Sequence, residues 1–172
     1  FDISPEGVIA TKRVFNFENE AAVYHLVVRV SDRNVPTLYA IDTMVINLLD
    51  VNEVPILEEQ EFSVDEHKPA YTIVDTVKWD DTDINPSKRI DVFTAVGGDT
   101  SLFAISTTGI ITTKKEFDYE TEPHTYTIDV KLADKNDPTL YVIKTITITI
   151  NEVNEVPKIT TDTIKVKENS DP

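Results

Sequence analysis

A short motif that occurs twice constrains this chain more than any other feature of its sequence. Residues 50–55 read DVNEVP and residues 152–157 read EVNEVP, so the copies lie 102 positions apart (50 to 152). The same offset aligns the surrounding segments without a gap, placing residues 1–4 on 103–106 and 15–18 on 117–120. A period near 100 residues is too long for a helical solenoid and suits a series of complete domains. The chain is therefore predicted to be a tandem array whose joints carry the motif.

This repeat predicts three segments. Residues 1–54 are expected to be the C-terminal part of a first unit, residues 55–156 a complete second unit, and residues 157–172 the start of a third. The first unit begins where the second has already run nearly half its length, so it lacks the strands that would complete its core. We expect upstream chain or a neighbour to supply them, because an open core and unpaired strand edges are liabilities.

Alternation of apolar and polar residues dominates the predicted elements. In residues 23–30, Tyr24, Leu26, Val28 and Val30 share one face, and residues 43–48 and 145–150 alternate in the same way. Sustained helical periodicity is absent and β-branched residues are abundant. The pattern predicts an all-β fold and favours an antiparallel sandwich, although a closed barrel is compatible with it.

The net charge limits the partners of the chain. Its 31 acidic residues exceed its 16 basic ones, giving −15 at neutral pH. Nucleic acid and anionic membrane surfaces both require a basic face, so neither is expected as a partner of this segment. Without cysteine there is neither a disulfide framework nor a thiolate metal site. We expect the chain to be a piece of a longer protein, with signals or anchors lying elsewhere.

Acidic residues occupy corresponding positions in turns and strand ends of both units. Alternate carboxylates, as in Asp81-x-Asp83 and Asp118-x-Glu120, point to the same side of an extended backbone. Two carboxylates about 4 Å apart repel by roughly 1 kcal/mol in water and about 4 kcal/mol near a protein surface. Several that converge on one joint need a counter-ion, and hard oxygen ligands select Ca²⁺. The sequence therefore predicts calcium at the joints.

The order of these motifs resembles that of cadherin repeats. Residues 103–111 are similar to the family's F-x-I-x-x-x-x-G-x-I segment, residues 117–120 to its L-D-Y/R-E motif, and residues 81–83 to its D-x-D motif. Glu66 resembles the X-E-X glutamate, and residues 50–53 resemble the D-x-N-D-N linker. The resemblance covers the whole chain and implies tandem seven-stranded Greek-key sandwiches of immunoglobulin-like, cadherin type, with Ca²⁺ bound in each linker.

The resemblance also implies the calcium ligands. The joint between the first and second units would use Glu18, Asp50, Asn52, Glu53, Asp81, Asp83 and Asp134. The next joint would use Glu66, Asp118, Glu120, Glu152, Asn154 and Glu155, with its remaining ligands after Pro172. Asp32 would serve the joint before Phe1. Because Asn16 stands where the family usually has Asp, and Glu53 and Val54 depart from its linker, we expect fewer or weaker ions at the first joint than the three that the family binds.

Two classes of function fit these features. The motifs of nucleophilic, phosphate-binding and metal-hydrolase enzymes are absent, so no catalytic residue is expected, and the three histidines are expected at the surface. The array is either an adhesive segment with a homophilic or heterophilic protein partner, or a spacer or filament segment whose partners are other repeats along the chain. Both place it outside the cell or at its surface, as the ectodomain of a longer, membrane-anchored protein.

Overall fold

The computed structural model describes residues 1–159, 163, 165 and 168. All regular structure in these residues is β-strand, and they include no helix long and apolar enough to cross a membrane. Most of the predicted start of a third unit, residues 157–172, lies outside the described residues. The strands of the first unit are β1 (Asp2–Ile3), β2 (Ile9–Ala10), β3 (Val23–Ser31) and β4 (Tyr39–Asn47). Those of the second are β5 (Ile56–Leu57), β6 (Gln60–Asp65), β7 (Ile73–Thr76), β8 (Trp79–Asp80), β9 (Asp91–Gly98), β10 (Phe103–Ile105), β11 (Ile110–Thr113), β12 (Thr125–Asp134) and β13 (Tyr141–Asn151).

The second unit is a sandwich of two sheets. One sheet has the strand order β6-β13-β12-β9 and the other the order β10-β11-β7, with the short pair β5-β8 at one end. The predicted all-β sandwich is confirmed, and the barrel alternative is wrong, because the two sheets do not close on each other. Alternate residues of the long strands are buried between the sheets: Ile128, Val130 and Leu132 in β12 and Ile146 and Ile148 in β13 are all 0% exposed.

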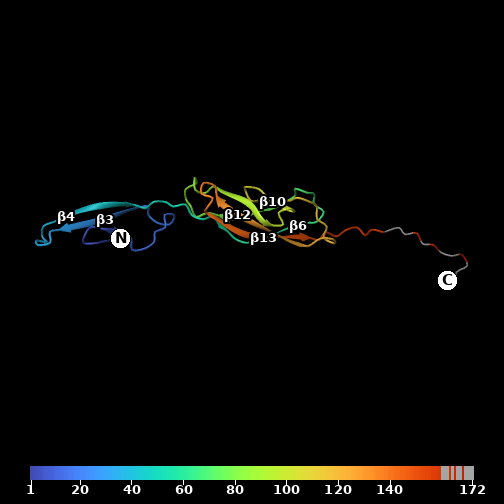
Figure 1. The fold of residues 1–172 in the computed structure, drawn as a ribbon, viewed down its shortest axis with the longest axis horizontal. Helices are drawn as coiled ribbons and strands as arrows, with labels where there is room; N and C mark the ends of the chain where they lie inside the picture. The colour runs from blue at the N-terminus through green and yellow to red at the C-terminus, as the bar shows by residue number, and fades with distance from the viewer. Residues whose placement is uncertain (160–162, 164, 166–167, 169–172) are drawn as a thin grey trace.

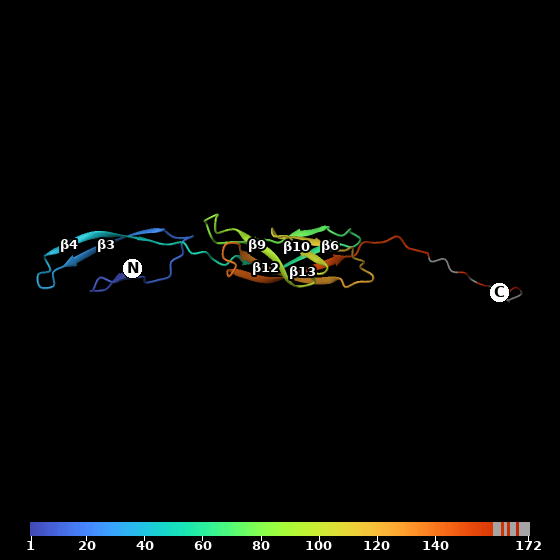
Figure 2. The ribbon, with the colours of Figure 1, turned by 45° about the horizontal axis from the view of Figure 1, so that its top comes forward.

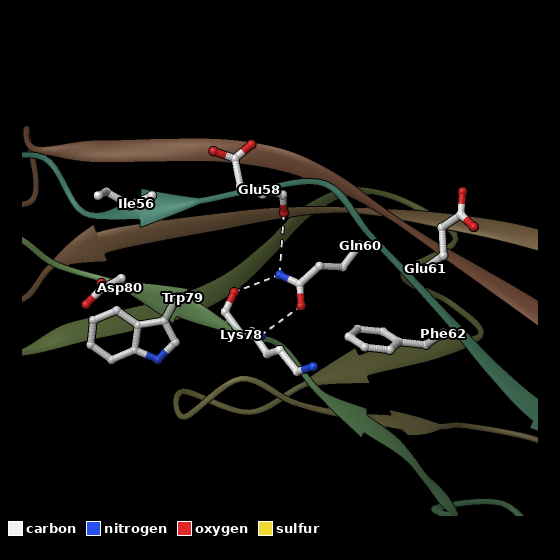
Figure 3. Close-up of a pocket in the computed structure, with 8 residues that line it drawn as sticks. All are labelled: Ile56, Glu58, Gln60, Glu61, Phe62, Lys78, Trp79 and Asp80. Atoms are coloured by element: carbon white, nitrogen blue, oxygen red, sulfur yellow. Dashed lines mark hydrogen bonds between the residues drawn. The ribbon is translucent and has the colours of Figure 1, made fainter.

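One strand pairing departs from the antiparallel pattern of the rest. β6 runs parallel to β13 from Gln60↔Ile146 to Asn151↔Asp65, whereas β13 pairs with β12 and β12 with β9 antiparallel. At the first residue of this pairing, the Gln60 side chain extends the hydrogen bonding toward β8. Its amide nitrogen donates to the Lys78 carbonyl at 2.7 Å, and its amide oxygen accepts from the Lys78 N–H at 2.8 Å (Figure 3). The Gln60 amide thereby pairs with both backbone groups of Lys78, as a residue of a neighbouring strand would.

The first unit repeats part of this architecture. β3 and β4 form a hairpin whose register, Val23↔Asn47 to Ser31↔Tyr39, is that of β12 and β13 displaced by the sequence offset. An aromatic trio recurs as well: Phe1 stacks on Phe15 with ring centroids 5.1 Å apart, and Phe103 stacks on Phe117 at 5.3 Å. Both pairs meet a tyrosine of the following strand, at position 24 or 126.

The two units lie end to end along the long axis of the molecule (Figures 1 and 2). The β3-β4 hairpin occupies one end, the sandwich the middle, and the segment after β13 continues in the same direction (Figure 1). Residues between β4 and β5 join the units. The acidic motif of residues 50–55 thus lies where the end of the first unit meets the beginning of the second.

Candidate metal centre

Carboxylates from both units converge at the joint between β4 and β5. Oxygen atoms of Glu18, Asp50, Glu53 and Asp83 all lie within 4.8 Å of one another. Glu18 comes from the turn that follows β2, Asp50 and Glu53 from the linker, and Asp83 from the loop after β8 of the second unit. Residues separated by more than 60 positions therefore form one acidic cluster, the joint-1 cluster.

The loop after β8 is built around its own aspartates. The Asp83 N–H donates to Asp81 Oδ1 at 2.7 Å, which folds the loop into a tight turn. The Glu53 N–H donates to Asp83 Oδ2 at 3.1 Å and so connects the linker to this turn. Asp81 and Asp83 are 3% and 0% exposed. The loop therefore holds two carboxylates out of water, facing the linker of the preceding unit.

Asn52 and Lys88 complete the surroundings of the joint-1 cluster. One atom of the Asn52 side-chain amide lies 3.1 Å from Asp83 Oδ2 and 3.3 Å from the Lys88 carbonyl oxygen. This atom is the amide nitrogen, because it faces two acceptors and donates to both. The Lys88 ammonium lies 2.9 Å from Asp50 Oδ1. It neutralises one carboxylate at the edge of the cluster and leaves the others uncompensated.

Asp134 occupies the end of β12 beside this loop. Its Oδ1 accepts the N–H groups of Asn136 at 2.7 Å and Asp137 at 2.6 Å, which fixes the turn after the strand. Its Oδ2 is buried without a hydrogen-bond partner. Directly across the sheet lies Asp91 at the start of β9. Burial, together with the charges of Asp81 and Asp134, raises the pKa of Asp91 to about 7.

Several oxygens of this joint are acceptors without donors. Glu18, Glu53, Asp81, Asp83 and Asp134 each have at least one buried carboxylate oxygen that accepts no hydrogen bond from the protein. Burial and the neighbouring charges raise the pKa of Glu53. A buried acceptor left unpaired costs about 1–3 kcal/mol, so the cluster is unfavourable without a cation. The donor set is all oxygen and includes a carboxamide and carboxylates, which fits Ca²⁺ rather than Zn²⁺ or Cu²⁺.

The joint after the second unit has one well-ordered ligand candidate. Glu66 is 1% exposed, and its two oxygens accept the N–H groups of Val153 at 2.7 Å and Tyr119 at 2.6 Å. These hydrogen bonds lower the pKa of Glu66 and keep it ionised. Glu66 thus ties residue 153 of the linker to residue 119 in the loop after β11.

The other predicted ligands of that joint lie more openly. Glu120 brings an oxygen within 4.8 Å of Glu66 and His67, and the negative charge of Asp118 also acts on Glu66. Glu152, Asn154 and Glu155 follow β13 in the linker at this end of the unit and are exposed. Glu155 Oε1 lies 2.5 Å from His67 Nε2. All of these carboxylates, in the part of the chain that the structure describes, come from the second unit and its linker.

Asp32 lies at the far end of the first unit, away from the joint-1 cluster. Its Oδ1 accepts from the N–H groups of Asn34 at 2.8 Å and Val35 at 2.6 Å, the arrangement seen at Asp134. Asp32 is exposed, whereas Asp134 is buried. The same turn is therefore formed in both units, and within the described residues another unit lies beside the turn of Asp134 alone.

Three charged residues in these surroundings were not anticipated from the sequence. Asp91 carries a signal that could have revealed it, because it shares its strand face with buried Phe93 and is therefore an acid at an inward position. His67 is exposed, as expected, and the sequence did not indicate that its ring lies against Glu66 and Glu155. Lys88 gave no signal, since a lysine in a polar loop is ordinary.

Comparison with known proteins identifies a family whose domains match this fold. The family model described as the cadherin domain matches residues 60–151, more than half of the chain. The chain is 30% identical to cadherin-23 of Rattus norvegicus over 157 residues, which cover 87% of this chain and 5% of that protein. It is 34% identical to protocadherin-1 of Homo sapiens over 167 residues, covering 93% and 15%. It therefore spans only a small part of these relatives.

Solved structures agree on the fold. The crystal structure of human protocadherin-24 EC1-2 superposes with a TM-score of 0.68 at 19% identity, covering 89% of this chain and 77% of that one. Tandem β-sandwiches joined by acidic linkers define a class of adhesion-type repeat proteins. The chain belongs to the cadherin domain family, which confirms the resemblance noted in the sequence. This is a family of adhesion and structural proteins rather than of enzymes.

Proposed function

We propose that this chain is a segment of an extracellular cadherin array that Ca²⁺ makes rigid and that acts in cell adhesion. The observation that carries the proposal is the joint-1 cluster, in which carboxylates of two successive units meet with buried oxygens that lack donors. The relationship to cadherin-23 and protocadherin-1 supports an extracellular or cell-surface location, as part of a longer membrane-anchored protein.

In this mechanism the chain provides the ligands from both sides of the joint. Glu18, Asp50, Asn52 and Glu53 would bind from the first unit, and Asp81, Asp83 and Asp134 from the second. Bound Ca²⁺ would supply the positive charge that these oxygens lack. Without it, the carboxylates repel one another and the linker is free to bend. With ligands on both units engaged, the relative orientation of the units is fixed.

The test is small-angle scattering of the whole chain with Ca²⁺ and with a chelator. We expect a narrower distribution of maximum dimensions with Ca²⁺ and a broader one with chelator. Identical profiles in the two conditions would refute calcium-dependent stiffening. Magnesium at the same concentration is the control, because Mg²⁺ demands a small octahedral site and dehydrates reluctantly.

A double substitution locates the effect. Asp81→Ala with Asp83→Ala should remove the calcium-dependent thermal stabilisation, which amounts to about 2.7 kcal/mol per site when free Ca²⁺ is about 100 times its Kd. The double variant Asp75→Ala with Asp99→Ala changes the net charge equally in the same unit and should keep the stabilisation. If the first pair leaves the stabilisation intact, the ligands lie elsewhere.

The second candidate function is a spacer or filament segment without an adhesive contact of its own. The end-to-end arrangement of the units and the joint between them favour it (Figure 1). Bead aggregation by the complete ectodomain separates the two functions. Calcium-dependent aggregation supports adhesion through a homophilic partner, and its absence, together with failure to bind cells, supports the spacer.

A further inference from the structure

The joint contains an acid that neither the repeat motifs nor the family resemblance assigns. Asp91 begins β9 and lies opposite Asp134 of β12 in the antiparallel register. Directly opposed residues of neighbouring strands project to the same face of the sheet. Phe93, two positions further along β9, is buried in the core, so this face of Asp91 points inward. Asp91 is thus held at the end of the core that faces the joint.

Asp91 has no donor for its carboxylate. Both of its oxygens are shielded from water and accept no hydrogen bond. Arg89 is the cation that acts on it, but the Arg89 guanidinium donates to Asp80 Oδ1 at 2.8 Å instead. The side chain is therefore placed among other acids without compensation from the protein.

Two neighbours of Asp91 share this condition. Asp81 Oδ2 and Asp134 Oδ2 are buried and accept no hydrogen bond, and these residues are only 3% and 1% exposed. The charges of both act on Asp91. Like charges on directly opposed strand positions oppose sheet pairing. Asp81, Asp91 and Asp134 thus each have a buried carboxylate oxygen without a donor, and hard oxygen ligands of this kind suit a divalent cation.

We propose that Asp91 is an additional calcium ligand, which together with Asp81 and Asp134 holds one Ca²⁺ on the second-unit side of the joint. The inference rests on the proposed calcium-binding function and adds to it a ligand from the interior of the sheet. The third carboxylate raises the affinity of this position above what Asp81 and Asp134 provide.

The test measures Ca²⁺ binding to the 172-residue chain by titration calorimetry in the wild type and in Asp91→Asn. The substitution keeps the shape and removes the charge. We expect the tightest site to weaken by at least about 10-fold or to disappear from the stoichiometry. Asp75→Asn is the matched control, because Asp75 loses the same charge on an exposed position of β7 and should bind like the wild type.

A second readout does not depend on heat of binding. Trp79 is the single tryptophan of the chain and lies two residues before Asp81, so it can sensitise Tb³⁺ bound at this position. Emission should fall strongly in Asp91→Asn and recover in part in Asp91→Glu, which restores the charge. With chelator, Asp91→Asn should melt at a higher temperature than the wild type, because it removes a buried uncompensated charge.

The outcomes separate the two proposals. If the wild type binds no Ca²⁺, the proposed function itself fails. If the wild type binds Ca²⁺ and Asp91→Asn binds the same number of ions with unchanged affinity, the role of Asp91 is refuted and the proposed function stands. Weakened binding with higher metal-free stability supports Asp91 as a ligand, since a residue needed only for folding would lower both.

Discussion

The two hairpins of this chain have the same register but differ in burial. Leu26 pairs with Met44 in the first unit, and Ile128 pairs with Ile146 at the corresponding positions of the second. Ile128 and Ile146 are fully buried, whereas Met44 is 45% exposed. The second hairpin faces the sheet β10-β11-β7, and no such sheet covers the first in the described residues. Local sequence therefore suffices for strand and register, while burial requires the opposing sheet.

Acids at corresponding positions of the two units also differ in burial. Asp32 and Asp134 each accept two backbone N–H groups in the same kind of turn. Only Asp134 is buried beside another acidic loop. The repeat thus supplies each unit with the same turn aspartate, and within the described residues a neighbouring unit lies beside Asp134 alone. Corresponding residues serve as internal controls for each other.

The largest expected difference is in the core. Ile128→Ala should destabilise the second unit by about 2–5 kcal/mol because it leaves a cavity between the sheets. Leu26→Ala should cost less than Ile128→Ala, since Leu26 is only partly buried and loses less packing. Urea unfolding followed by circular dichroism reports both units, and Trp79 fluorescence reports the second. Equal losses would mean that the first hairpin is covered as well as the second.

Calcium should distinguish the two turn aspartates. Asp134→Ala should remove most of the rise in melting temperature that Ca²⁺ produces, equivalent to about 2.7 kcal/mol for one site at 100 times its Kd. Asp32→Ala should leave that rise unchanged. Differential scanning calorimetry with Ca²⁺ and with chelator measures both. A loss of the calcium effect in Asp32→Ala would place a site at the open end of the first unit.

The glycines of the equivalent turns separate backbone strain from packing. Gly7 and Gly109 both have φ +87°, so alanine at either position pays about 1–2 kcal/mol for the left-handed conformation. A Cβ at Gly109 would also meet the Phe93 ring at 2.9 Å, whereas nothing lies within 4 Å at Gly7. Gly109→Ala should therefore cost about 1–3 kcal/mol more. Equal costs in chemical denaturation would show that the Phe93 ring moves aside freely.

The smallest effect concerns pH and arises from Asp91 of the second unit. The pKa of Asp91 is raised from its ordinary value of 3.8 to about 7, so between these values the folded state binds more protons than the unfolded state. Stability in chelator should therefore fall as pH rises through this window. We expect a melting temperature a few degrees higher near pH 5 than near pH 7.5. The dependence should flatten in Asp91→Asn, and a wild type that is more stable at pH 7.5 would contradict the assignment.

Much of the fold could be predicted from the sequence. Alternation in residues 23–30 and 145–150 identified long strands because each has one face in the core and one in solvent. The parallel pairing of β6 with β13 could not be foreseen, since it joins segments more than 80 residues apart and no local pattern encodes it. The offset between the copies likewise predicted which acids of the first unit correspond to which acids of the second, because repeated domains form the same turns at equivalent positions.

The site was predictable where its residues lie in motifs. Glu18, Asp50, Glu53 and Asp83 were expected at one joint, and their oxygens lie together there. Asp91 was missed because it belongs to a strand that reads as ordinary core sequence. His67 is at the surface as expected, but its contact with Glu155 could not be predicted, because the two residues are 88 positions apart in the chain. Such contacts follow from tertiary geometry rather than from spacing along the chain.

The parallel pairing of β6 with β13 has a mechanical consequence. The second unit is entered at the end where β5 and β6 begin and is left where β13 ends, so tension along the molecule pulls these two neighbouring strands in opposite directions. Their hydrogen bonds are then loaded in shear and must yield together rather than one after another. A unit built in this way resists extension most strongly along the axis on which successive units are strung.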